Sequence, residues 1–99
     1  MENDIKKIEI ITDGSLQSRM ILAVDATGVS GYTIIKDVAG KGLKGTKDGH
    51  GISGGFKNFY MMLCCDETEA RKVVEAVKPI ITKYGGICIV SDAHWIIHN

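Results

Sequence analysis

The sequence predicts an α+β fold in which four strands and two helices follow one another in the order βαββαβ. Four runs are rich in β-branched and aromatic residues, two segments between them repeat apolar residues at helical spacing, and one long stretch is glycine-rich and almost without apolar residues. The expected strands cover residues 6–12, 31–38, 56–65 and 86–91, and the expected helices cover residues 16–27 and 66–85. This order is that of the ferredoxin-like fold.

The two helices are recognised by their periodicity and by their ends. Gly28 follows the first helix at the point where a left-handed C-cap is expected. Asp66 and Glu69 open the second helix at the spacing of a capping box, and its apolar stripe runs to Gly85. Pro79 lies inside that stripe and removes one backbone donor, so we expect a kink or a loosened last turn there.

A long flexible loop is predicted between the second and third strands, at residues 39–55, which hold most of the glycines. Residues 40–45 match the spacing GxGxxG, but no helical period follows them, and no Gly-Lys-Ser/Thr follows the spaced glycines. Both a Rossmann turn and a Walker loop are therefore excluded. The glycines would still let backbone N–H groups approach an anion, with charge from Lys41 and Lys44. A solvated linker would have the same composition, so both interpretations stay open on these residues alone.

The predicted sheet is apolar on both faces, although two helices can cover only one of them. In the third strand, Phe59, Met61, Leu63 and Cys65 alternate with Tyr60, Met62 and Cys64, and in the fourth strand Ile87 and Ile89 alternate with Cys88 and Val90. An exposed apolar face of this size favours coverage by another subunit. The alternative is a monomer with a half-exposed apolar sheet.

Composition restricts the classes of partner. Twelve basic and twelve acidic residues give a formal net charge of zero, so the chain lacks the broad positive field that nucleic-acid binding uses, and no nucleic-acid partner is expected. The first residues are polar, and no apolar stretch approaches the length of a membrane span, so we expect a single cytoplasmic domain over residues 1–99 without membrane insertion.

Cysteine and histidine do not form a predicted metal site. Cys64, Cys65 and Cys88 lie in apolar runs and are expected to be free thiols, and the adjacent pair points to opposite faces of a strand. His94 and His98, if both lay in one strand, would be about 13 Å apart, too far to share a metal. No catalytic grouping is recognisable, so neither an enzyme nor a cofactor is predicted.

Taken in order, the first strand KKIEIIT, the helix after it, Gly31-Tyr32-Thr33, residues 38–45 and a fourth strand that ends in Ser91-Asp92-Ala93 resemble the PII superfamily of signalling proteins over nearly the whole chain. The resemblance implies a homotrimer that binds adenine nucleotides in clefts between subunits. The Gly-Tyr-Thr start, the Gly-Lys-Gly loop base and the turn at residues 84–87 look closest to SbtB-like and carboxysome-associated PII-like proteins, which are linked to bicarbonate.

The resemblance also implies site residues and partners. The nucleotide-binding positions carried over are Gly31, Tyr32, Thr33, Gly40, Lys41, Gly42, Lys44, Met62, Cys64, Gly85 and Gly86. Bicarbonate or another anion is expected at Lys41, Gly42 and Lys44. The loop at residues 39–55 corresponds to the T-loop, which implies a partner protein such as a bicarbonate transporter or a carboxysome component.

Departures from standard PII proteins narrow the expected ligand. The T-loop has no tyrosine for nucleotidyl modification, and Leu43 or Lys44 stands where standard PII proteins have a glutamine that helps hold Mg-ATP and 2-oxoglutarate. Ile87 replaces a basic residue, and only His98 is left as a counterpart of the C-terminal arginines. Fewer cations favour AMP or ADP over ATP and predict no response to 2-oxoglutarate. The alternatives are slow nucleotide hydrolysis aided by Lys41 or Lys44, and a metal-tolerance trimer of the CutA type, in which no long loop is expected.

Overall fold

The computed structural model describes residues 4–41 and 57–99, and it has the predicted βαββαβ order. The elements are β1 (Asp4–Asp13), the 3-10 turn η1 (Gly14–Leu16), α1 (Gln17–Asp25), β2 (Thr33–Val38), β3 (Asn58–Cys65), α2 (Glu67–Tyr84) and β4 (Ile87–His94). The gap at residues 42–56, which lies outside the described residues, contains most of the expected T-loop, residues 39–55. The segment joins β2 to β3, as expected.

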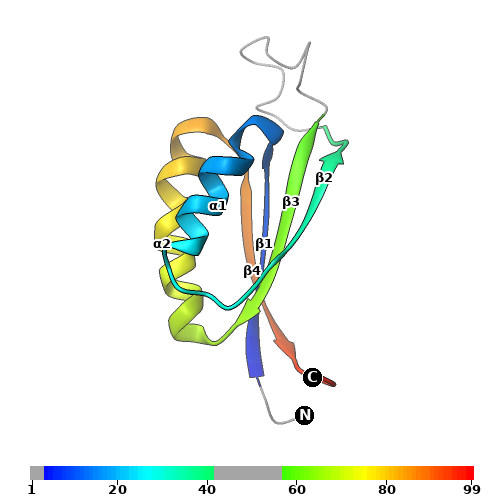
Figure 1. Cartoon of the computed structure of the whole chain (residues 1–99), viewed down its shortest axis with the longest axis vertical. Coiled ribbons are helices and arrows are strands. Elements are labelled where there is room, and N and C mark those ends of the chain that lie inside the picture. The colour runs from blue at the N-terminus through cyan, green and yellow to red at the C-terminus, as the bar shows by residue number, and fades with distance from the viewer. Residues whose placement is uncertain (1–3, 42–56) are drawn as a thin grey trace.

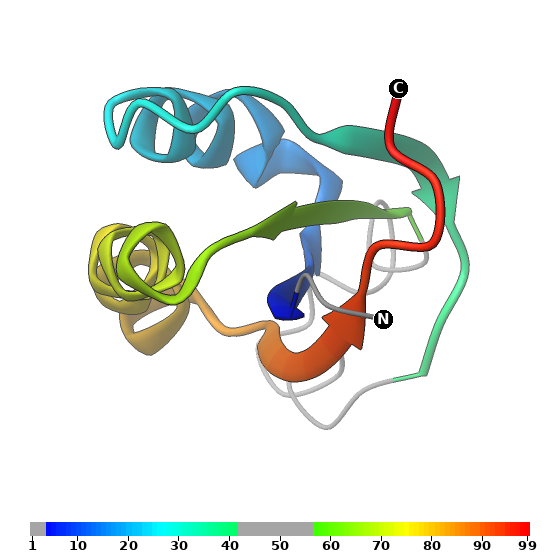
Figure 2. The same cartoon turned by 90° about the horizontal axis from the view of Figure 1, so that it is seen from below.

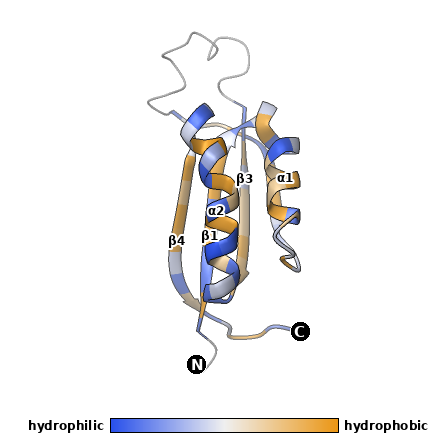
Figure 3. Cartoon of the chain, turned by 90° about the vertical axis from the view of Figure 1, so that its left-hand side faces the viewer, coloured by the Kyte–Doolittle hydropathy of each residue, from blue (hydrophilic) through white to orange (hydrophobic). Residues whose placement is uncertain are grey.

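The four strands form one antiparallel sheet in the order β2-β3-β1-β4, so β1 and β3 are central and β2 and β4 are edges. The helices α1 and α2 lie side by side over one face (Figures 1 and 3). Seen along the strands, the other face carries no helix, and the C-terminal segment after β4 runs on that side (Figure 2). We call the side without helices the open face.

The hydrophobic core lies between the sheet and the two helices. The sheet contributes Ile8, Ile10, Phe59, Met61 and Leu63, and the helices contribute Met20, Val24, Ala70, Val73 and Val77, all of them buried. The strand residues are every second residue of β1 and β3, because successive side chains of a strand point to opposite faces. Burial of these side chains supplies most of the stabilisation that holds the helices on the sheet.

The helix ends agree with the sequence in most respects. Asp66 accepts a hydrogen bond from the backbone N–H of Glu69 at 2.8 Å, and the Glu69 carboxylate accepts one from the Asp66 N–H at 3.1 Å, so the capping box is confirmed. Gly28 has the expected positive φ of 85°, although α1 itself ends three residues earlier, at Asp25. The α2 helix passes through Pro79 to Tyr84, and the Gly85 N–H closes its last turn, so the expected loosening of that turn is wrong.

The fourth strand is longer than its apolar residues predict. Its polar residues continue the pairing with β1 as far as Asp4 opposite His94. Lys6 forms an ion pair with Asp92, and His94 Nδ1 lies 2.8 Å from Asp4 Oδ1. These cross-strand pairs extend β4 beyond its apolar segment, which ends at Val90.

The open face keeps the apolar character that the sequence predicts. On β3, Tyr60, Met62 and Cys64 are only half-buried, whereas their neighbours on the helix side are buried. Ile35, Ile87 and Ile89 on the edge strands are 53%, 50% and 49% exposed. Within one chain, no helix that the structure describes packs over these residues, whereas the two helices pack over the core residues (Figure 2).

Candidate functional site

The first group of expected nucleotide-binding residues lies along the β2 side of the sheet. Thr33 opens β2 directly opposite Met62, and Cys64 follows on the same face of β3, with its Sγ 3.9 Å from Met62 Sδ. Gly31 and Tyr32 immediately precede Thr33 in the connection from α1. Five of the expected residues are therefore brought together on one edge of the molecule.

Contacts within the chain hold the side chain of Tyr32 in place. Its hydroxyl donates a hydrogen bond of 2.9 Å to Asp25 Oδ1 at the end of α1, and this bond to a carboxylate raises the pKa of Tyr32. The ring also packs against the hydrophobic core. Tyr32 thus anchors the chain where it enters β2, a structural role that the sequence resemblance did not indicate.

A β-bulge forms the base of the T-loop on the β2 strand. Ile35 pairs with Tyr60 and Val38 pairs with Asn58, so two residues of β2 oppose the single residue between them on β3. Asp37, within the bulge, has a φ of 56°, in the left-handed region. Bulges bend and twist an edge strand, and this one redirects the chain just before residues 40–41.

The described part of the loop base stays close to β3. A Cβ built on Gly40 would lie 3.5 Å from Asn58 Nδ2, so Gly40 is in contact range of the first residue of β3. Lys41 is the last described residue before the gap. Gly42 and Lys44 lie outside the described residues.

The second group, Gly85 and Gly86, forms the turn from α2 into β4. Both have positive φ, 95° and 130°. A Cβ on Gly86 would lie only 2.5 Å from Thr12 Cγ2 and 2.8 Å from the carbonyl oxygen of Ile11. The turn is therefore pressed against the end of β1, and only glycine fits at its second position.

The loop base and the Gly85-Gly86 turn stand at opposite edges of the sheet. The loop base follows β2 and the glycine turn precedes β4, with β3 and β1 between them. The loop base and the glycine turn lie at the same end of the strands, because Val38 pairs with Asn58 beside Asp13, and Ile87 pairs with Ile11. Gly31, Tyr32 and Thr33 lie at the other end of β2, because Thr33 opens that strand opposite Met62. Three strand spacings correspond to roughly 14 Å, so one chain does not bring these groups into a single cleft.

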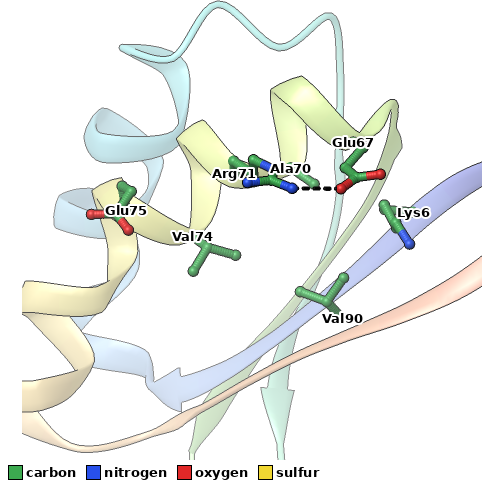
Figure 4. A pocket seen from close by; sticks show the side chains of 7 residues that line it. All are labelled: Lys6, Glu67, Ala70, Arg71, Val74, Glu75 and Val90. Atoms are coloured by element: carbon green, nitrogen blue, oxygen red, sulfur yellow. Dashed lines mark hydrogen bonds and ion pairs between the residues drawn. The ribbon is translucent and has the colours of Figure 1, made fainter.

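A shallow hollow between α2 and β4 contains none of the expected site residues. It has a volume of ≈ 260 Å³ and is lined by Lys6, Glu67, Ala70, Arg71, Val74, Glu75 and Val90 (Figure 4). Arg71 is paired with Glu67 at 2.7 Å on its rim. The residues expected to bind nucleotide are thus not part of the hollow.

The three cysteines are free, as expected. Burial raises the pKa of Cys65 to about 11 and also raises the pKa of Cys88, so both thiols stay protonated at neutral pH and are poor nucleophiles. Cys65 faces the core and Cys64 the open face, which confirms that the adjacent pair points in opposite directions.

The two C-terminal histidines make separate contacts. His94 ends β4 in contact with Asp4, and the ring of His98 stacks on Trp95 with centroids 4.0 Å apart. Within residues 4–41 and 57–99, no group of three or more histidine, cysteine or acidic side chains could hold a metal ion. Over the same ranges, no helix has the length and apolarity needed to cross a membrane.

The element order, the sheet order and the long connection between β2 and β3 define a ferredoxin-like α+β protein. Its sequence matches the family model "Nitrogen regulatory protein P-II" over residues 5–98. The chain therefore belongs to the PII family, whose members are mostly non-catalytic signalling proteins. A comparison with curated proteins gives no significant match.

Solved structures of PII-like proteins have the same fold. CPII from Thiomonas intermedia K12, in a structure bound to ADP and bicarbonate, is 27% identical, with a TM-score of 0.76 over 93% of this chain and 88% of that one. A PII-like signalling protein from Thermus thermophilus is 20% identical, with a TM-score of 0.73 over 95% and 91% of the two chains. GlnK from B. subtilis, in a complex with ATP, is 18% identical, with a TM-score of 0.67 over 94% and 84%.

Proposed function

We propose that this chain is a PII-like regulator that binds AMP or ADP in clefts between the subunits of a homotrimer. In this proposal it also binds bicarbonate at the T-loop base, and it acts in the cytoplasm on inorganic-carbon uptake or fixation. In this proposal, a bicarbonate transporter or a carboxysome component recognises the T-loop. Support for the ligands comes from CPII, about a quarter identical to this chain, whose structures contain ADP, AMP and bicarbonate.

The observation that carries the proposal is the division of the expected site between two edges of the sheet. Gly40 and Lys41 follow one edge strand, and Gly85 and Gly86 precede the other, at the same end of the strands. In a closed ring, the β2 side of one subunit meets a different surface of its neighbour. Such a contact would complete a cleft from two half-sites, each already present in one chain.

Gly31 tests a different part of the expected site, because it lies just before β2, at the end of that strand away from Gly40 and Lys41. A Cβ at Gly31 would have nothing within 4 Å, and its φ is not in the left-handed region, so the fold of one chain does not require glycine there. A neighbouring subunit or a nucleotide that approaches the backbone closely would require it. We therefore expect Gly31→Ala to leave the fold intact and to weaken nucleotide binding.

Lys41 is the described cation best placed to contact phosphate or bicarbonate from the loop base. A charge-assisted contact contributes about 1.5–3 kcal/mol, so Lys41→Ala should weaken ADP binding by roughly tenfold or more. Lys72→Ala, which removes an exposed lysine from the first half of α2, is the matched control and should bind as the unmodified protein does.

The deciding experiment is calorimetric titration with AMP, ADP and ATP, each with and without bicarbonate. We expect AMP or ADP to bind more tightly than ATP, and 2-oxoglutarate to have no effect. Absence of affinity for any adenine nucleotide, or strong synergy between 2-oxoglutarate and Mg-ATP, would overturn the proposal. Equal binding by Gly31→Ala, Lys41→Ala and the control would refute the assigned site even if nucleotide binds elsewhere.

A further inference from the structure

The zero net charge of the chain conceals a separation of charge along the strands. The end that carries η1, the loop base and the Gly85-Gly86 turn is the upper end in Figure 1. Its described basic residues are Arg19, Lys36, Lys41, Lys57, Lys78 and Lys83, and its acidic residues are Asp13 and Asp37. Six positive and two negative side chains give this end a formal charge of +4.

The rest of the described chain carries the opposite charge. Residues 4–41 and 57–99 contain ten basic and ten acidic side chains, so four basic and eight acidic ones remain, a formal charge of −4. Many of these acids lie at the start of α2 and on the lower part of β1 and β4, where Lys6 and Arg71 are already paired with Asp92 and Glu67. We call the two ends the basic end and the acidic end.

A cation–aromatic cluster forms part of the basic end. The guanidinium carbon of Arg19, on α1, lies 5.0 Å from the ring centroid of Tyr84, and Lys83 Nζ lies 5.3 Å from the same centroid. Tyr84 is 42% exposed at the end of α2. Neither Arg19 nor Lys83 forms an ion pair with another residue that the structure describes.

We propose that the Arg19–Tyr84–Lys83 cluster is a docking surface for an acidic segment of a partner protein. The guanidinium group can donate two parallel hydrogen bonds to a carboxylate, while the aromatic ring holds its orientation. The remaining positive charge of the basic end steers an acidic partner toward the cluster. The proposal uses none of the residues assigned to nucleotide binding.

The distribution of charge favours an acidic protein segment over a nucleic acid or an anionic membrane. Arginine and tyrosine are enriched in the centres of protein interfaces, and here they occur together on an exposed surface. Extended polyanions neutralise many cations over a long track, but the basic patch is confined to one end and the acidic end repels them. A short acidic segment matches the size of the patch better.

The test measures binding of a fluorescein-labelled polyglutamate peptide to the full-length protein by anisotropy, at low and at near-physiological salt. The test variant is the double substitution Arg19→Gln and Lys83→Gln. The matched control is Arg71→Gln with Lys72→Gln, which removes one arginine and one lysine from exposed positions near the acidic end. We expect the test variant to bind roughly tenfold more weakly and the control to bind as the unmodified protein does.

Each other outcome contradicts the proposal. If both double variants weaken binding equally, the peptide responds only to total charge and the cluster is not a docking surface. Tighter binding of single-stranded DNA or of phosphatidylserine vesicles than of the peptide would assign the basic end to another class of partner. Salt-sensitive self-association in light scattering, lost in the test variant, would mean that the acidic end of a second copy is the occupant. Unchanged thermal unfolding of both variants establishes that they fold.

Discussion

Gly28, Gly31 and Gly86 differ in how strongly their backbone conformation and their neighbours require glycine. The free energy of unfolding of the three alanine variants measures this difference. Gly86 combines a φ of 130° with overlap of any Cβ on Thr12 and Ile11, so Gly86→Ala should lower the free energy of unfolding by about 2–4 kcal/mol. Gly28 has positive φ but open space, so alanine there should cost only about 1 kcal/mol. Gly31→Ala should be neutral or stabilise by about 0.5 kcal/mol.

Urea denaturation at one fixed protein concentration tests this order, because the stability of an oligomer depends on concentration. Equal losses for Gly86→Ala and Gly28→Ala would mean that the turn can move away from β1. A large loss for Gly31→Ala would mean that a neighbouring subunit already needs the space, and it would then report on assembly instead of on ligand binding.

Cys65 predicts how stability depends on alkaline pH. Burial raises its pKa from an ordinary value of 9.0 to about 11, because the folded state disfavours the thiolate. Its contribution to stability is therefore complete below pH 9 and is lost as the pH rises toward 11, because the unfolded chain loses the proton first. Chemical denaturation of Cys65→Ala should show a shallower loss over this range than the unmodified protein. Identical pH profiles would contradict the assignment.

At the level of elements, the bulge in β2 stores backbone strain at the base of the T-loop. Asp37 is the one described non-glycine residue with positive φ. Glycine at this position should stabilise the protein by about 1 kcal/mol, whereas Asp37→Val should destabilise it by about 1–3 kcal/mol, because a β-branched residue disfavours that region strongly. Lys36→Val, at the neighbouring bulge position without positive φ, is the control for added apolar surface. If the two valine variants unfold alike, the bulge is not strained.

The sequence predicted elements well where a local pattern governs them. The alternation in residues 59–65 and the capping box at Asp66 are local signals, and both describe the structure correctly. The strand β4 extends to His94, beyond its predicted end at residue 91, because Asp92 and His94 are held by cross-strand partners on β1 that are remote in sequence. The bulge was missed for the same reason, since only the register against β3 reveals it; an aspartate that tolerates positive φ is a weak signal.

The sequence could predict which residues belong to the candidate site, but not how these residues are arranged in space. The resemblance named Gly31 and Gly86 together, but no local pattern shows that they belong to opposite edges of one sheet. The role of Tyr32 as an anchor on Asp25 depends on how the α1–β2 connection folds back onto the helix. The separation of charge between the two ends was equally hidden, because composition reports only the sum.

For the whole molecule, the exposed isoleucines are the strongest argument for assembly. Ile87 and Ile89 on β4 and Ile35 on β2 lie on the open face, each about half exposed, beside the half-buried residues of β3. Covering half of an isoleucine removes enough apolar surface to contribute about 1–2 kcal/mol, and a ring of three subunits repeats this gain at each interface. The polar contact between Tyr60 and Glu9, at 2.7 Å, lies on the same face and is satisfied within the chain. Burial of this face by a neighbour would therefore leave neither group unpaired.

We accordingly predict a homotrimer that dissociates when charge is placed on the open face. Ile87→Lys with Ile89→Lys should give monomers at micromolar concentration, because burying two unpaired ammonium groups costs several kcal/mol at each interface. Leu22→Lys is the control: Leu22 is 72% exposed on α1, on the helix side, and the same change there should leave the trimer intact. Light scattering coupled to size-exclusion chromatography gives the mass of each variant. A monomeric unmodified protein would contradict the prediction, and so would a trimer that survives the double substitution but not Leu22→Lys, since the helix side would then form the interface.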